Sequence, residues 1–163
     1  MKKSILVFVI LSWVFVFETQ ASNYFVQKEL VSEQVQEGVV IINKRKSGEY
    51  IGETSGRAMT MKVYKTTGNT KILWSLEDAG GGYVRLKNLG SGKYLHCENG
   101  GLQIGDIEQG WQSAQWRIEK KDGYVRIQNR FKGFYLNNQN EILELSKMKK
   151  KGGDSSLWKI RNP

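Results

Sequence analysis

The sequence predicts an all-β fold with threefold internal symmetry, and two repeating patterns support this. Tryptophan recurs every 42 residues, at Trp74, Trp116 and Trp158. Between the tryptophans, a short apolar or alternating run ends in asparagine and is followed by a glycine and a tyrosine, in segments 41–51, 85–95 and 126–136. Tandem copies of about 40 residues indicate three units, each of which buries its apolar face only against the other two.

Within each copy, short strand patterns alternate with turn signals. Residues 83–87 and 124–128 alternate apolar and polar side chains, as half-buried strands do. Turns are predicted at Ser55-Gly56, at 80–82, at 99–101, at Asp122-Gly123 and at 137–140. The spacing gives about four strands per copy and about twelve in all. Twelve short antiparallel strands in three copies predict a β-trefoil, a six-stranded barrel capped by three hairpins, with repeats at 39–82, 83–123 and 124–163.

The first 21 residues have the pattern of a secretory signal peptide. Lys2 and Lys3 precede an apolar run over 5–17, and residues 19–21 provide small side chains at the −3 and −1 positions of a cleavage site. The run is shorter than the ~18–20 residues of a transmembrane helix, so an uncleaved anchor is the less favoured alternative. We expect a secreted protein that begins at Ser22, with no membrane span after cleavage. Residues 22–38 are expected to form an N-terminal arm leading into the domain at 39–163.

The remaining chain of about 140 residues is one domain of ordinary size. The formal net charge of +9 changes little on loss of the leader and favours acidic partners. The single cysteine, Cys97, has no partner for an internal disulfide. We expect a buried free thiol; an exposed thiol that pairs two chains is the alternative.

At this point the repeats resemble a known family. The segment 116–129, Trp-Arg-Ile-Glu-Lys-Lys-Asp-Gly-Tyr-Val-Arg-Ile-Gln-Asn, and its counterpart that begins at Trp74, are similar to the ricin B-type lectin repeat. In that family a tryptophan closes one repeat and a Gly-Tyr turn opens the next. The resemblance covers 39–162 and implies a β-trefoil with carbohydrate-binding hairpins.

The sequence departs from the family pattern at three kinds of position. The glutamine two residues before the closing tryptophan is replaced in all three repeats, by Ile72, Ala114 and Ser156. The sugar-binding aspartate of the family falls at Gly52, His96 and Asn137, and its aromatic platform falls at Tyr64, Asp106 and Met148. No repeat therefore retains a complete inherited pocket.

Repeat two offers the densest set of replacement groups for binding sugar. Trp111 is outside the tryptophan period, and an indole flanked by amides can stack on a pyranose while the amides bond its hydroxyls. The candidate carbohydrate-binding residues here are His96, Asn99, Trp111 and Gln112. Repeat one offers a smaller set, Glu53, Tyr64 and Asn69. The alternative for Trp111 is that it only packs over the hairpin.

Basic residues form local clusters at 44–46, at Arg130 with Lys132, and at 147–151. The first two occupy the same turn in repeats one and three, so clustered cations around the threefold axis are the basis of a second hypothesis. Under it the protein binds heparin or another anionic surface, or acts as a protein-interaction trefoil such as an inhibitor or a signalling ligand. The alternative is that these basic clusters are only solvated loop residues with no binding function. Nucleic acid is not the expected partner, since cations alone bind it without sequence preference.

Catalytic and metal-binding groups are scarce. His96 and Cys97 are the only histidine and cysteine, too few for a zinc site, and adjacent strand residues point to opposite faces. The glycines at 80–82 are not followed by the Lys-Ser/Thr of a phosphate loop. The sequence predicts no enzyme, metal or cofactor. It predicts a secreted, non-catalytic, lectin-like β-trefoil whose partners are glycans or glycoconjugates, sulfated ones included.

Overall fold

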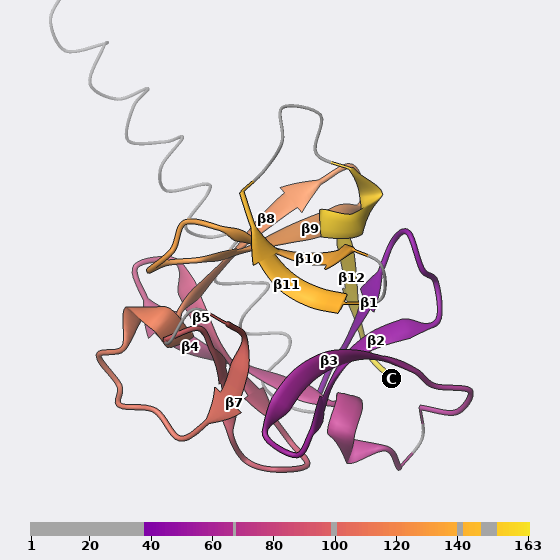
Figure 1. Ribbon diagram of the computed structural model, residues 1–163, viewed down its shortest axis with the longest axis horizontal. Helices are drawn as coiled ribbons and strands as arrows, with labels where there is room; N and C mark the ends of the chain where they lie inside the picture. The colour runs from indigo at the N-terminus through magenta and orange to yellow at the C-terminus, as the bar shows by residue number, and fades with distance from the viewer. Residues whose placement is uncertain (1–37, 67, 99–100, 140–141, 148–152) are drawn as a thin grey trace, which may run out of the picture.

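The structure is a computed structural model that describes residues 38–163 except 67, 99–100, 140–141 and 148–152. The predicted leader and almost all of the predicted arm at 22–38 lie outside the described residues. The described chain forms twelve strands and three short 3-10 helices (Figure 1). The elements in order are β1 (Val40–Asn43), β2 (Glu49–Thr54), β3 (Arg57–Lys62), η1 (Thr70–Ile72), β4 (Trp74–Gly80), β5 (Tyr83–Asn88), β6 (Tyr94–His96), β7 (Gln103–Gly105), η2 (Gln112–Ala114), β8 (Trp116–Lys121), β9 (Tyr124–Asn129), β10 (Tyr135–Gln139), β11 (Ile142–Ser146), η3 (Asp154–Ser156) and β12 (Trp158–Arg161).

Strand pairing confirms the β-trefoil. Six strands pair antiparallel around a barrel in the order β1, β12, β9, β8, β5 and β4. A bridge between Val39 and Trp74 joins β4 back to the start of β1 and closes the ring. The remaining strands form three hairpins, β2–β3, β6–β7 and β10–β11. Each repeat therefore contributes two barrel strands and one capping hairpin.

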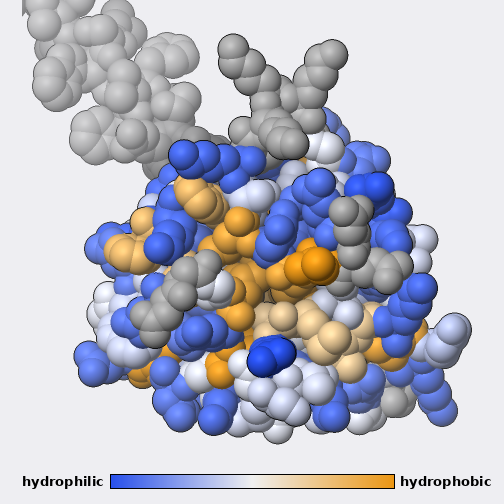
Figure 2. All heavy atoms as spheres, viewed as in Figure 1, coloured by the Kyte–Doolittle hydropathy of each residue, from blue (hydrophilic) through white to orange (hydrophobic). Residues whose placement is uncertain are grey.

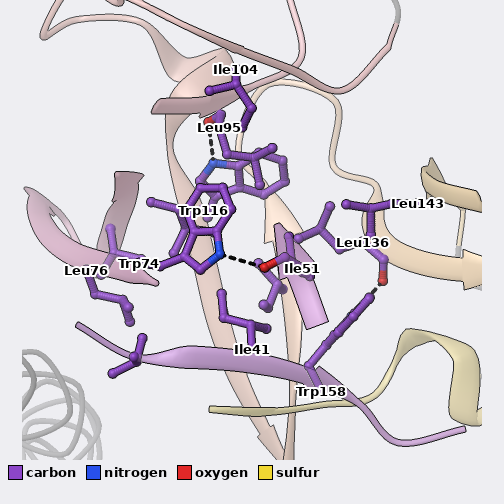
Figure 3. Packing of buried hydrophobic residues seen from close by; sticks show 14 residues of the cluster. Ile41, Ile51, Trp74, Leu76, Leu95, Ile104, Trp116, Leu136, Leu143 and Trp158 are labelled. Carbon is purple, nitrogen blue, oxygen red and sulfur yellow. Dashed lines mark hydrogen bonds between the residues drawn. The ribbon is translucent and has the colours of Figure 1, made fainter. Parts of the chain in front are cut away.

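The three periodic tryptophans are equivalent core residues. Each is fully buried at the start of β4, β8 or β12. Each indole N–H donates to a carbonyl of its own repeat's hairpin, Trp74 to Ile51 at 2.8 Å and Trp116 to Leu95 at 3.0 Å (Figure 3). The third, Trp158, donates to Leu136 at 3.1 Å. The large ring fills the centre while its one polar atom is satisfied, so the same contact fixes each hairpin to the barrel.

Three asparagines at the ends of β1, β5 and β9 make a second threefold set. The side-chain amides of Asn43, Asn88 and Asn129 are buried and donate to carbonyls in the middle of η3, η1 and η2, at 2.8–2.9 Å. Their Oδ1 atoms accept from the backbone N–H groups two and three residues later. Each asparagine thus closes the turn after its own strand and holds the 3-10 helix of the preceding repeat. These bonds confirm that segments 44–46 and 130–132 occupy the same turn.

Of the five predicted turns, three are present and one is wrong, and the turn at 99–101 lies largely outside the described residues. Ser55-Gly56 and Asp122-Gly123 have positive φ at both central residues, as a type I′ hairpin turn requires. Residues 137–139, predicted as part of a turn, instead belong to β10 and pair with β11. The side chains of Asn137 and Asn138 form hydrogen bonds with Glu144 and Glu49, and these contacts outweigh the usual preference of asparagine for turns.

The three hairpins make up one face of the molecule. Apolar side chains gather in the middle of this face and hydrophilic ones form its rim (Figure 2). Ala58, Leu102 and Leu145 are partly buried there against the central core.

Among the described residues no helix is long and apolar enough to cross a membrane.

Candidate functional site

The hairpin of repeat two brings His96 and Trp111 into contact. Their ring centroids lie 6.0 Å apart at an interplanar angle of 64°, an edge-on arrangement. His96 ends β6 and is only 6% exposed, whereas Trp111 is half-buried. The imidazole occupies space opposite Gly105 of β7, where an added Cβ would lie 2.8 Å from Nε2. The glycine therefore makes room for the histidine, and the histidine supports one edge of the indole.

Trp111 stands at a position that the fold leaves free. It directly precedes η2, where the equivalent residues before η1 and η3 are Asn69 and Gly153. An amide, a glycine and an indole thus serve at three equivalent positions. The aromatic ring is an addition specific to repeat two, in contrast to the periodic tryptophans.

Burial lowers the pKa of His96 below its ordinary value of 6.5, with a smaller opposing effect of Glu98. The Nδ1 atom is buried without a hydrogen-bond partner among the described residues. The imidazole is therefore neutral at physiological pH. The neutral ring can orient Trp111. The next residue along the chain, Gln112, is exposed. Asn99, the fourth residue predicted for this site, lies outside the described residues.

The equivalent space in repeat one is filled from the opposite strand. Gly52 stands in the place of His96, and the side chain of Met61, in the place of Gly105, packs against it together with Ile72. The predicted repeat-one residues do not form one pocket. Glu53 accepts a hydrogen bond from the Gly56 backbone N–H at 2.7 Å in the hairpin turn, and Tyr64 is fully exposed. Among the described residues, neither forms a hydrogen bond with Asn69.

Repeat three carries a polar set that the sequence analysis did not single out. Asn137, in the place of His96, donates to Glu144 at 3.3 Å and to Gln139 at 3.4 Å. Its neighbour Asn138 donates to Glu49 of repeat one at 2.8 Å. The Oδ1 atoms of both asparagines are buried without a partner among the described residues. The opposition of Asn137 and Glu144 depends on the hairpin register, which the wrong turn prediction concealed.

Cys97 is a buried free thiol, as predicted. Burial raises its pKa to about 11, so the thiolate is scarcely populated at neutral pH. Within the described ranges, no group of three or more His, Cys, Asp or Glu side chains is arranged to hold a metal ion.

Solved structures with the same fold include both enzymes and lectins. A GlcNAcα1-4Gal-releasing endo-β-galactosidase from Clostridium perfringens matches with a TM-score of 0.68 and 23% identity, over 77% of this chain and 32% of that one. The designed threefold-symmetric protein ThreeFoil matches with a TM-score of 0.62 and 24% identity, over 77% of this chain and 98% of that one. A Polyporus squamosus lectin, solved with the human-type influenza-binding epitope Neu5Acα2-6Galβ1-4GlcNAc, matches with a TM-score of 0.65 and 15% identity, over 77% of this chain and 49% of that one.

At these identities the matches show the fold. The chain spans about a third of the clostridial enzyme and about half of the fungal lectin. No curated protein is similar enough in sequence to count as a match.

The amino-acid sequence also matches a known protein family. Residues 13–111 match the family described as ricin-type β-trefoil lectin domain-like. The matched stretch begins inside the predicted leader and runs through repeat one to Trp111. It covers more than half of the chain, and the twelve-strand trefoil agrees with it. The protein belongs to the ricin-type β-trefoil lectin domain-like family.

Proposed function

We propose that the protein is a non-catalytic carbohydrate-binding module whose principal site lies on the hairpin of repeat two. The observation that carries the proposal is the half-buried Trp111, held edge-on by His96 at a position where the other repeats have asparagine and glycine. The other two repeats form the same fold without an indole at this position, and the ring of Trp111 is supported by His96 and partly open to solvent. Such a ring can stack on the C–H face of a sugar.

Each residue of this site has a distinct role. Trp111 provides the stacking surface, and the exposed amide of Gln112 bonds sugar hydroxyls. His96 acts mainly from beneath, because its ring is almost completely buried. Asn99, three residues after His96 in the sequence, is proposed as the source of a second amide. The family aspartate is absent, so binding at one pocket is weak, near the millimolar range or about 4 kcal/mol.

The test is a broad glycan array probed with the wild type and with Trp111→Ala. We expect the variant to lose binding, and the wild-type signal for neutral glycans to change little with salt concentration. Tyr64→Ala reports on repeat one. Phe131→Ala is the matched control, since Phe131 is an exposed aromatic residue (56%) outside both candidate sets.

Retained binding by Trp111→Ala would exclude the site in repeat two. Loss of binding in Tyr64→Ala alone would move the site to repeat one. Thermal unfolding of each variant shows whether a loss of binding reflects a loss of fold.

We further propose that the protein is secreted after cleavage before Ser22. The basic and apolar pattern of residues 1–21 supports this. N-terminal sequencing of the protein from its native source tests it, and an intact Met1 on a cytosolic protein would contradict it.

A further inference from the structure

The three interfaces between neighbouring repeats have the same backbone arrangement. The residue after each of the three equivalent asparagines, at position 44, 89 or 130, donates its backbone N–H to a carbonyl at 157, 73 or 115. Its side chain then packs over the residue five positions before the asparagine of the preceding repeat around the threefold axis, at 124, 38 or 83. Three equivalent contacts within one molecule allow their charges to be compared directly.

At two of the three interfaces, the residue after the asparagine is either uncharged or paired with a carboxylate. At one, Leu89 packs on Gly38, and the interface residues carry no charge. At another, the ammonium group of Lys44 lies 4.9 Å from the ring centroid of Tyr124 and 3.0 Å from a carboxylate oxygen of Asp154. Its hydrogen bond to Asp154 raises the pKa of Lys44.

The third interface holds two cations on one ring. The guanidinium of Arg130 lies 4.6 Å from the ring centroid of Tyr83, and that of Arg117 lies 4.8 Å from it. Where the Lys44 interface has Asp154, this one has Gln112, the first residue of η2. Among the described residues, neither arginine forms an ion pair with a carboxylate. Two carboxylates on β4 and β8 are engaged elsewhere: Glu77 accepts a hydrogen bond from Tyr94, and Glu119 accepts one from Tyr135.

Both guanidinium groups are held in place by neutral acceptors. Arg117 donates to the hydroxyl of Tyr83 at 2.8 Å, and Arg130 donates to the side-chain oxygen of the buried Gln115 at 2.6 Å. A guanidinium has five N–H donors, so each arginine keeps several for a ligand. Their hydrogen bonds and their contact with the tyrosine ring restrict both side chains, which reduces the entropy lost on binding.

We propose that Arg117 and Arg130, clamped on Tyr83, form a binding site for a sulfate ester or a phosphate monoester. These oxyanions present several acceptor oxygens and suit the forked donors of two guanidinium groups. A bound anion would supply the negative charge that Asp154 supplies at the equivalent interface. The site adjoins the proposed carbohydrate site, which includes Gln112, but its arginines do not depend on the stacking surface of Trp111.

The experiment measures binding of two probes at low salt: a sulfated heparin tetrasaccharide, and vesicles of equimolar phosphatidylcholine and phosphatidic acid. The test variant is the double substitution Arg117→Gln with Arg130→Gln. The control is Lys159→Gln with Lys44→Gln, because these residues hold the same positions at the Lys44 interface and the same charge is removed. We expect the test variant to weaken binding of the preferred probe by about tenfold or more, and the control to weaken it far less.

Two reciprocal substitutions sharpen the test. Gln112→Asp places a carboxylate where Asp154 stands at the equivalent interface, and we expect it to abolish oxyanion binding while the fold is kept. Asp154→Gln removes that carboxylate, and we expect a second site and a higher stoichiometry. If the arginine variant proves unstable on thermal unfolding, Gln112→Asp decides the question.

The probe that binds identifies the source of the oxyanion, a sulfated glycan or a phosphate headgroup. The proposal is overturned if neither probe binds, if the arginine variant binds as tightly as the wild type, or if the lysine control loses as much. The last result would mean that binding follows net charge. The result with the two oxyanion probes does not depend on whether Trp111→Ala loses binding to neutral glycans. Either proposal can therefore be overturned while the other stands.

Discussion

The centre of the barrel and the outer hairpins follow different rules within the same three repeats. In the centre, each repeat uses the same tryptophan contact and the same asparagine contact. On the hairpins, the three equivalent positions 52, 96 and 137 have different surroundings. Met61 packs against Gly52 in repeat one, His96 packs against Gly105 in repeat two, and Asn137 donates to Glu144 in repeat three. The comparison shows that closure of the barrel restricts the interior equally in every repeat. The hairpins need only fill their local volume, so they are free to diverge.

Equivalence in the centre predicts equal damage. Replacement of Trp74, Trp116 or Trp158 by alanine should lower the free energy of unfolding by about 3–5 kcal/mol, because each leaves a large cavity and an unpaired hairpin carbonyl. Urea denaturation of the three variants measures this. A tryptophan whose loss costs much less than that of the other two would contradict the symmetry of the core.

The asparagines should show the same equality at a smaller scale. Asn43→Ala, Asn88→Ala and Asn129→Ala each remove a buried amide that donates to a 3-10 carbonyl and accepts from two backbone N–H groups. We expect a loss of about 1–3 kcal/mol for each, from the buried groups left without partners. Chemical denaturation provides the measurement. Asn162→Ala, an exposed asparagine after β12, is the control.

Exchange of hairpin fillings tests the rule for the outer region. Gly52→His copies repeat two into repeat one, and we expect a loss of about 1–3 kcal/mol because Met61 already occupies that space. Adding Met61→Gly copies the matching glycine and should restore part of the loss. A double-mutant cycle on the free energy of unfolding gives the coupling. Strict additivity of the two changes would show that the two side chains do not share one volume.

The smallest expected effect is a pH dependence that belongs to repeat two. Burial lowers the pKa of His96 in the folded protein, so the unfolded chain takes up the proton first as the pH falls below about 6.5. Its contribution is complete above that pH and is lost toward the lower, folded pKa. His96→Gln should reduce the fall in unfolding free energy between about pH 7.5 and pH 5.5. Since the chain has one histidine, an unchanged pH dependence in the variant would contradict this.

The tryptophan period was sufficient to predict the fold because each large ring has one site in the barrel that can bury it. The same period placed Trp111 outside the symmetric set, and its position before η2 agrees with that reading. The pairing of His96 with Trp111 could not be predicted, because it depends on the space left by Gly105 across the hairpin. Repeat three was misread because asparagine-rich sequence favours a turn in isolation and a strand only when β11 pairs with it.

The sequence alone therefore determined the architecture, the three equivalent tryptophans and the burial of Cys97. It determined these because a repeated hydrophobic pattern has few ways to close. Only the tertiary structure decided that His96 packs against Trp111, and which of three equivalent interfaces holds two arginines on one tyrosine. Those features depend on side chains that meet across a hairpin or between repeats, and their separation in sequence carries no sign of the contact.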